Sequence, residues 1–290
     1  MKQLNLFIEL TRLKRPIGFM LLFWPCAWGL TLAYNFSNNL NNYFFYLTLF
    51  FLGSILMRSA GCIVNDISDK EFDKKVERTK NRPIASNKVP IKLAIFYTIL
   101  LCSIAFLILI NFNNLTIILA LGSMPLAFAY PLMKRFTYWP QLFLGITFNY
   151  GLILGWTSIV GEINLIPIIF YLGAIFWTLG YDTIYGFQDI KDDEIIGVKS
   201  TSIKFKKKPK QFIFLCYLIF ISSLTIVGFF MNFSYLFYFF SIIAAIQLIF
   251  FQIYKLNFKN PKNCLYIFKS NNFLGLLVFF SILVGRLSIQ

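Results

Sequence analysis

Residues 17–34 form a continuous apolar run without a single charged side chain, and no other feature constrains the fold as strongly. As an α-helix, a run of this length crosses a hydrocarbon core of about 30 Å. Eight further runs carry at most one charge each, at residues 44–64, 91–110, 115–133, 141–160, 164–186, 211–230, 234–254 and 270–285. The pattern predicts an all-α polytopic membrane protein with nine transmembrane helices. It leaves no room for a separate soluble domain, so residues 1–290 are expected to form one membrane-embedded domain.

The distribution of basic residues predicts the orientation in the bilayer. The chain is 58% hydrophobic and 13% charged, with a net charge of +15. If the N-terminus lies inside, Lys and Arg gather in segments on the inner side of the membrane. These segments are residues 2–15, 70–92, 134–135, 191–210 and 255–269. Arg286, near the C-terminus, is the exception. This pattern places the N-terminus on the cytoplasmic side and the C-terminus outside. Anionic lipid therefore explains the charge better than nucleic acid does.

The remaining composition excludes several kinds of site. The five cysteines include no C-x-x-C pair, so neither a disulfide framework nor a zinc site is expected. The first apolar run is longer than the core of a signal peptide, and we expect it to be retained. Because the chain has no histidine, acid–base chemistry would fall to carboxylates, Lys, Tyr or water.

Ten of the twelve acidic residues fall in two short stretches, 66–77 and 182–194. Each stretch begins at the predicted inner end of a span and continues into an inside loop. On a continuous helix, Asp66, Asp69 and Asp73 would share one face, and so would Asp182, Tyr185, Asp189 and Asp193. Asp69 precedes Asp189, and Asp73 precedes Asp193, by the same interval, which suggests two equivalent halves that face each other.

Carboxylates stacked on one helix face repel each other and need a counter-charge. Mg²⁺ suits such a site, since it binds one or two carboxylates and completes its shell with phosphate oxygens and water. The pattern therefore predicts a site for a magnesium–diphosphate complex. The alternative interpretation is that the acids are solvated ends of loops, and we assign Glu71, Glu77, Asp192 and Glu194 to that role.

Basic residues beside the two stretches are candidates for binding the diphosphate; they are Arg78, Lys80, Arg82, Lys134, Arg135 and Lys199. Arg58 differs from these because it lies within an apolar span, about two turns before Asn65. An arginine at that depth is costly unless it faces a cavity or a partner.

The chain resembles the UbiA superfamily of intramembrane prenyltransferases, and within it the 4-hydroxybenzoate polyprenyltransferases. The resemblance extends from the start of the chain to about residue 205. It is carried by Arg15-Pro16-Ile17-Gly18, Trp24-Pro25, the segment from Arg58 through Asn65-Asp66 to Pro83, Tyr130 to Arg135, Pro140-Gln141, and the segment from Trp177 through Tyr181-Asp182 to Thr201.

The resemblance implies a nine-helix bundle around a central cavity that opens to lipid, with Mg²⁺ as cofactor. The implied reaction transfers a polyprenyl group from its diphosphate to the ring of 4-hydroxybenzoate, in ubiquinone synthesis, at a bacterial or mitochondrial inner membrane. It assigns the magnesium–diphosphate to Asn65, Asp66, Asp69, Asp73, Asp189 and Asp193.

Further roles follow from the same resemblance. Lys134 and Tyr130 would assist the diphosphate, and Arg58 or Arg135 would bind the acceptor carboxylate. Asp182 would border the acceptor, and Asp182 or Asp189 would take a proton from the ring.

Two other functions remain open on the sequence alone. One is prenyl transfer to a different acceptor. The other is a cation-coupled transporter, which is disfavoured because transporter sites lie near the middle of the bilayer and these acids collect at one surface. Prenyl chain length and oligomeric state depend on packing that the sequence does not specify.

Overall fold

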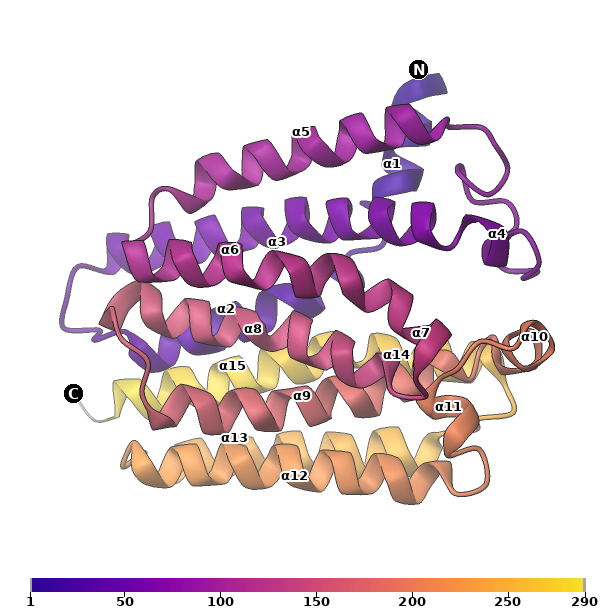
Figure 1. Cartoon of the computed structure of the whole chain (residues 1–290). Helices are drawn as coiled ribbons and strands as arrows, with labels where there is room; N and C mark the ends of the chain where they lie inside the picture. Colours follow the sequence, from indigo (N-terminus) through magenta and orange to yellow (C-terminus); the bar gives the residue numbers. More distant parts are fainter. Residues whose placement is uncertain (1, 289–290) are drawn as a thin grey trace.

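The computed structural model describes residues 2–288, and all regular elements within them are helical (Figure 1). The long helices are α2 (Ile17–Ala33), α3 (Leu40–Ser68), α5 (Ile91–Leu109), α6 (Asn114–Ala129), α8 (Pro140–Val160), α9 (Leu165–Gly186), α12 (Pro209–Phe230), α13 (Tyr235–Ile246) and α15 (Asn271–Leu287). They run alongside one another and form a single bundle. The predicted all-α bundle is confirmed.

The predicted spans correspond to these helices one by one. Within residues 2–288, eight segments are long and apolar enough to cross a membrane, and α2 is a shorter apolar helix of 17 residues. The helices extend beyond several apolar runs, since α3 covers Leu40–Ser68 where the sequence predicts 44–64. The start of α1 (Lys2–Thr11) and the end of α15 lie at opposite ends of the bundle (Figure 1). Which end faces the cytoplasm stays a prediction.

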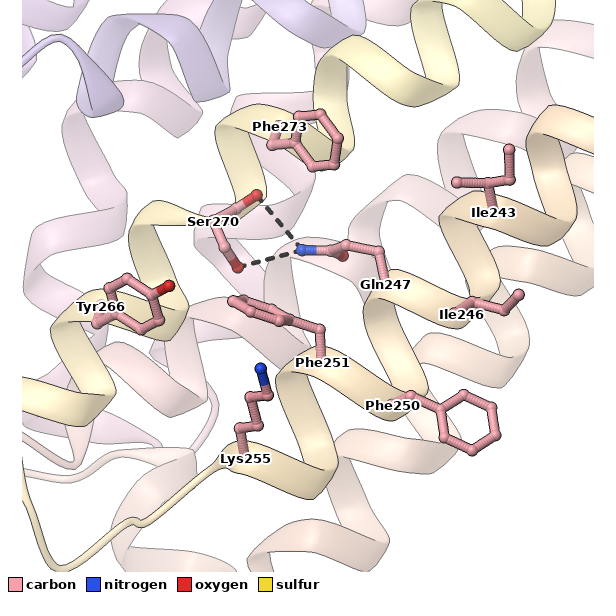
Figure 2. A pocket seen from close by; sticks show the side chains of 9 residues that line it. All are labelled: Ile243, Ile246, Gln247, Phe250, Phe251, Lys255, Tyr266, Ser270 and Phe273. Atoms are coloured by element: carbon pink, nitrogen blue, oxygen red, sulfur yellow. Dashed lines mark hydrogen bonds between the residues drawn. The ribbon is translucent and has the colours of Figure 1, made fainter.

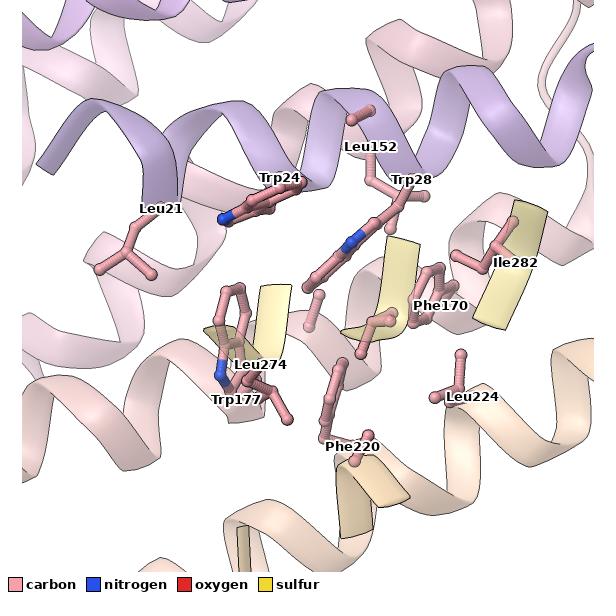
Figure 3. Packing of buried hydrophobic residues seen from close by; sticks show 14 of the residues in the cluster. Leu21, Trp24, Trp28, Leu152, Phe170, Trp177, Phe220, Leu224, Leu274 and Ile282 are labelled. Atoms are coloured by element: carbon pink, nitrogen blue, oxygen red, sulfur yellow. The ribbon is translucent and has the colours of Figure 1, made fainter. Parts of the chain in front are cut away.

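The core is built from aromatic side chains where α2, α9 and α12 meet (Figure 3). The rings of Trp28 and Trp177 lie 5.0 Å apart, and those of Trp177 and Phe220 lie 5.8 Å apart. Each indole N–H has an acceptor on α15: Trp28 Nε1 donates to the carbonyl of Gly275, and Trp177 Nε1 donates to Asn271 Oδ1. Buried indoles need such partners, so these bonds hold α15 against the core.

Small residues allow α2 and α8 to cross closely. A Cβ on Gly155 would lie 2.3 Å from the carbonyl oxygen of Cys26, and a Cβ on Gly29 would lie 2.0 Å from that of Leu152. Helices in lipid gain their packing energy from such close contact, because lipid itself provides little hydrophobic drive between them. This crossing sets one wall of the cavity described below.

Short elements gather at one end of the bundle (Figure 1). They are α4 (Lys70–Asp73), η1 (Tyr130–Leu132), α7 (Met133–Phe136), α10 (Ile190–Ile196) and α11 (Thr201–Lys204). Three further helices complete the described chain: α1 (Lys2–Thr11), the π-helix η2 (Gln247–Ile253) and α14 (Pro261–Lys269). Both acidic stretches belong to the end with the short elements.

Candidate active site

The first acidic stretch straddles a break between two helices. α3 ends at Ser68, Asp69 lies at the junction with φ −99° and ψ 4°, and α4 follows and ends at Asp73. The prediction of one continuous helix face was therefore wrong. The break turns the chain, and Asp66, Asp69 and Asp73 are all buried nonetheless.

The second stretch has the same construction. α9 ends at Gly186, Asp189 lies at the junction with φ −113° and ψ 8°, and Asp193 lies one turn into α10. The amide of Asp193 donates to the carbonyl of Asp189, as that of Asp73 does to Asp69. The equal spacing in the sequence thus reflects a repeated local structure, although neither half is a continuous helix.

Arginines neutralise the first set of carboxylates. Arg82 Nη1 donates to Asp73 Oδ2 at 2.8 Å and to Asp66 Oδ1 at 3.1 Å. Arg12, from the turn after α1, forms a second ion pair with Asp66. Because a buried carboxylate without a partner is costly, these pairs make it possible to bury Asp66.

Two cations connect the two stretches. Arg78 follows the first stretch and donates from Nε to both carboxylate oxygens of Asp189, at 2.8 and 3.0 Å; its Nη1 donates to the Tyr185 hydroxyl at 3.2 Å. Lys134 Nζ lies 2.5 Å from Asp69 Oδ2 and also interacts electrostatically with Asp193. The two acidic stretches therefore face each other across Arg78 and Lys134.

Several carboxylate oxygen atoms at this end have no hydrogen-bond partner within residues 2–288. Asp69 Oδ1 is buried without a hydrogen bond, and the side-chain carboxylate of Asp193 has no hydrogen-bond or ion-pair partner there. No group of three or more acidic or cysteine side chains in the described chain is close enough to hold a metal ion by itself. Mg²⁺ seldom uses an all-protein cage and completes its shell with water or phosphate oxygens, so these free carboxylate oxygens fit it chemically.

Burial changes the acidity of these carboxylates. Desolvation raises the pKa of Asp69 and Asp73, although Lys134 and Arg82 partly oppose the rise. Desolvation together with repulsion from Asp189 raises the pKa of Asp193 to about 7. A cation placed beside these groups would reverse the effect, because an opposite charge favours the ionised form.

An apolar cavity of about 220 Å³ leads away from the carboxylate end, bounded by α2, α3, α5, α6 and α8. Arg58 and Tyr130 line it, and the other lining side chains are almost all apolar. The Arg58 guanidinium lies over the ring of Phe148, 5.3 Å from its centroid, and has no hydrogen-bond or ion-pair partner within residues 2–288. A cation in this setting is a candidate for binding an anionic ligand.

Gly18 and Asp182 flank Arg58. A Cβ on Gly18 would lie 2.9 Å from Arg58 Nε, so the glycine leaves room for the guanidinium. Asp182, on α9, is partly buried and interacts electrostatically with Arg58. The sequence singled out all three residues, and the structure brings them together.

Two predicted residues lie elsewhere. Arg135 donates from Nη2 to the carbonyl of Ser68 at 2.6 Å and does not line the cavity. This cation at the C-terminus of α3 stabilises the helix end. The Lys199 side chain donates to the carbonyl of Phe136 at 3.2 Å, away from the carboxylates, while its backbone amide donates to the carbonyl of Lys134 at 2.9 Å.

The segment that contains Lys199 is fastened to α8 and α9. Gln141 accepts from the amide of Thr201 at 3.0 Å, and the hydroxyls of Thr183 and Thr201 lie 2.7 Å apart. Ser202 donates to the carbonyl of Thr183. These bonds give the Gln141 and Ser200-Thr201 motifs a structural role, namely to hold the loop that contacts Lys134.

Sequence reasoning missed Arg12. Its charge interacts with Cys62, Asp66, Tyr185 and Tyr130, so it lies between the carboxylates and the cavity. Burial alone would lower its pKa, but these surrounding groups raise it. In the sequence Arg12 is one of several basic residues before the first span, and nothing local distinguishes it from Lys14 or Arg15.

A second hollow, of about 610 Å³, lies between η2 and the α14–α15 corner (Figure 2). Gln247 donates to Ser270 there, and Lys255 is its one charged residue. Among the described residues, no acidic side chain and none of the predicted site residues lines it. Of the two cavities, the one beside Arg58 is therefore the candidate active site.

Comparisons with known proteins agree with the fold. The model of the UbiA prenyltransferase family matches residues 22–281. The chain belongs to this family. Family membership decides between a transferase and a transporter in favour of the transferase.

Curated relatives match almost the whole chain of this UbiA family member. A mitochondrial 4-hydroxybenzoate polyprenyltransferase of Drosophila pseudoobscura pseudoobscura is 40% identical, covering 97% of this chain and 70% of the relative. The Caenorhabditis elegans protein of the same name is 39% identical, with 97% and 78% covered. A 4-hydroxybenzoate geranyltransferase of Lithospermum erythrorhizon is 40% identical, with 99% and 92% covered.

Solved structures share the fold. A UbiA homologue from Aeropyrum pernix K1 superposes with a TM-score of 0.73 at 21% identity, covering 94% of this chain and 98% of that one. A homologue from Archaeoglobus fulgidus, bound to GPP and Mg²⁺, superposes with a TM-score of 0.70 at 16% identity, with 96% and 99% covered. At these identities the likeness shows the fold alone.

Proposed function

We propose that this protein transfers a prenyl group from a prenyl diphosphate to the ring of 4-hydroxybenzoate, with Mg²⁺, as a step of ubiquinone synthesis. The observation that carries the proposal is the position of Arg58. Arg58 has no ion-pair partner in the described part of the chain, and it lies in the apolar cavity that leads away from the carboxylates. The names of the curated relatives support 4-hydroxybenzoate as the acceptor.

Charge balance supports a magnesium–diphosphate at the carboxylate end. Six carboxylates and five cations gather around the two stretches; they are Asp66, Asp69, Asp73, Asp182, Asp189 and Asp193, with Arg12, Arg58, Arg78, Arg82 and Lys134. A diphosphate adds further negative charge, so divalent cations are needed to offset it. When bound, Mg²⁺ would stabilise the charge that develops on the leaving group. Asn65 and the free oxygens of Asp69 and Asp193 would contribute ligands.

The protein's own cations would hold and orient the diphosphate. Arg78 and Arg82 present planar forks that match phosphate oxygens, and Lys134 provides a point charge between the two stretches. Tyr130 lies at the cavity end, one helical turn before Lys134. The diphosphate would thus sit at the mouth of the cavity with its prenyl tail inside.

The cavity would protect the reaction and orient the acceptor. The allylic carbon–oxygen bond breaks, and the resulting carbocation must be kept from water, which the apolar wall provides. Arg58 would bind the acceptor carboxylate, and the ring carbon ortho to the hydroxyl would attack the carbocation. Asp182, close to Arg58, would accept the ring proton, so that the aromatic ring is restored.

The distribution of the basic segments supports a cytoplasmic position for this end of the bundle, or a matrix position in mitochondria. The word "mitochondrial" in several relatives' names supports the second setting.

Membranes containing the protein, incubated with 4-hydroxybenzoate and geranyl diphosphate, should form the prenylated acid, and EDTA should abolish the product. Homogentisate and a dihydroxynaphthoate offered in parallel test the alternative acceptors. Product from one of these, and none from 4-hydroxybenzoate, would overturn the proposal.

A further inference from the structure

The hollow between η2 and the α14–α15 corner has a polar end and an apolar end (Figure 2). At the polar end, Lys255 Nζ lies 4.7 Å from the centroid of the Phe251 ring, and that ring lies 5.9 Å from the ring of Tyr266. Away from this end the lining side chains are mostly apolar; they include Ile243, Ile246, Phe250 and Phe273. Such a wall suits a molecule with a polar head and an apolar tail.

Gln247 joins the two sides of the hollow. Its Nε2 donates to Ser270 Oγ at 3.2 Å, where α14 meets α15, and its Oε1 accepts from Gln252 Nε2 at 3.1 Å. Gln252 also donates to Asn271 Oδ1 at 3.1 Å. The π-helical form of η2 brings Gln247 and Gln252 together, because its hydrogen bonds join residues five apart. These bonds fix η2 against the corner, so the hollow is preformed.

The polar end lies at the same end of the bundle as the acidic stretches. Lys210, in the first turn of α12 and close after α11, donates from Nζ to the carbonyl of Tyr254 at 3.3 Å. Lys255 is the next residue and follows the apolar span Tyr235–Ile253. Ile243 lies twelve residues earlier, which is at most about 18 Å along the helix. Half of a hydrocarbon core of about 30 Å has a similar length, so the hollow matches one leaflet.

The charge around the polar end is positive and uncompensated. The Lys255 ammonium and the Tyr266 hydroxyl have no hydrogen-bond or ion-pair partner within residues 2–288. Residues 195–290 contain eleven Lys and Arg but no Asp or Glu. This part of the chain can therefore pair with a phosphate but not with the ammonium group of a zwitterionic headgroup. A net anionic headgroup is favoured.

We propose that the hollow binds one anionic phospholipid from the leaflet on the side of the acidic stretches. Its phosphate would accept from Lys255 and Tyr266, and one acyl chain would lie along Phe250 and Ile246 toward Ile243. The inference is independent of the proposed function, because none of these residues lines the cavity beside Arg58.

The test measures the binding of phosphatidylglycerol and phosphatidylcholine with identical acyl chains to the full-length protein, by native mass spectrometry from a neutral detergent. The wild type should bind one phosphatidylglycerol roughly fivefold more tightly than phosphatidylcholine. Lys255→Gln should remove this preference. Lys259→Gln is the matched control, since Lys259 is exposed, lies four residues away and does not line the hollow. This control should keep the preference.

A second pair of variants tests the apolar part. Ile246→Trp fills the hollow and should weaken the binding of both lipids roughly tenfold. Ile242→Trp is its control, because Ile242 is exposed on the same helix but does not line the hollow. Ile242→Trp should bind both lipids as the wild type does. The midpoint of thermal unfolding in lipid-free detergent verifies that each variant is folded.

Four results would overturn the inference. One is equal binding of the two lipids by the wild type, and another is the same preference in Lys255→Gln as in Lys259→Gln. Displacement of phosphatidylglycerol by farnesyl diphosphate in EDTA would assign the hollow to a second prenyl chain. A dimer that is lost only in Ile246→Trp would assign it to a second copy of the protein.

Discussion

Arg58→Gln should weaken binding of 4-hydroxybenzoate while leaving binding of the prenyl diphosphate largely intact. Arg58 has no hydrogen-bond or ion-pair partner among residues 2–288, so its full hydrogen-bonding capacity is available to the acceptor carboxylate. A hydrogen bond to a charged group contributes about 1.5–3 kcal/mol. Since about 1.4 kcal/mol corresponds to a tenfold change, KM for 4-hydroxybenzoate should rise roughly 10- to 150-fold.

Arg135→Gln provides the matched control, because it removes the same charge from a residue that binds the Ser68 carbonyl outside the cavity. The assay measures initial rates against acceptor concentration at saturating geranyl diphosphate and Mg²⁺. It is repeated with 4-hydroxybenzamide, whose ring lacks the carboxylate charge. The increase in KM caused by Arg58→Gln should be much smaller with this neutral acceptor.

Two results would refute this reasoning. Equal increases in KM for Arg58→Gln and Arg135→Gln would mean that general electrostatics, and not a specific contact, attracts the acceptor. An equal increase in KM for 4-hydroxybenzoate and for 4-hydroxybenzamide in Arg58→Gln would mean that Arg58 shapes the cavity and does not bind the carboxylate.

Three further substitutions test other parts of the site and the fold. Asp189→Asn should lower kcat at least about 100-fold under saturating Mg²⁺, as loss of a strong electrostatic contact does, whereas Asp192→Asn should retain near wild-type rates. Arg12→Gln should raise KM for geranyl diphosphate by about tenfold, while the exposed Arg15→Gln changes it little, and comparable effects of the two would contradict the role given to Arg12. Gly155→Leu should lower the midpoint of thermal unfolding by several degrees, because its side chain would overlap α2; an unchanged midpoint would show that the helices separate readily.

The spans were predictable because charge is costly in lipid. Long apolar runs with at most one charged residue have few alternatives to a membrane helix, so residues 17–34 and the eight further runs identified the helices correctly. The same cost made the acidic stretches conspicuous. Asp66 and Asp189 had to be paired or functional, and the structure finds both paired with arginine.

Long-range pairing was not predictable from spacing. Arg12 and Asp66 are separated by 54 positions, and which basic residue of the first segment reaches the carboxylate depends on the turn after α1. That Arg58 lines the cavity while Arg135 does not could likewise be seen only in the folded structure. The helix break at Asp69 was not predicted because no proline or glycine marks it in the sequence. The ion pairs of the first acidic stretch form beside this break, and they depend on tertiary structure.

The central claim is that the two acidic stretches jointly hold a divalent cation with the donor's diphosphate. Mn²⁺ binding followed by electron paramagnetic resonance, with and without geranyl S-thiolodiphosphate, tests it directly on the intact protein. The account predicts that the thiolodiphosphate strengthens Mn²⁺ binding, and that Asp69→Asn and Asp193→Asn each weaken it by about tenfold or more. An affinity for Mn²⁺ that does not change when the thiolodiphosphate is added, or that is the same in both variants as in the wild type, would contradict the account.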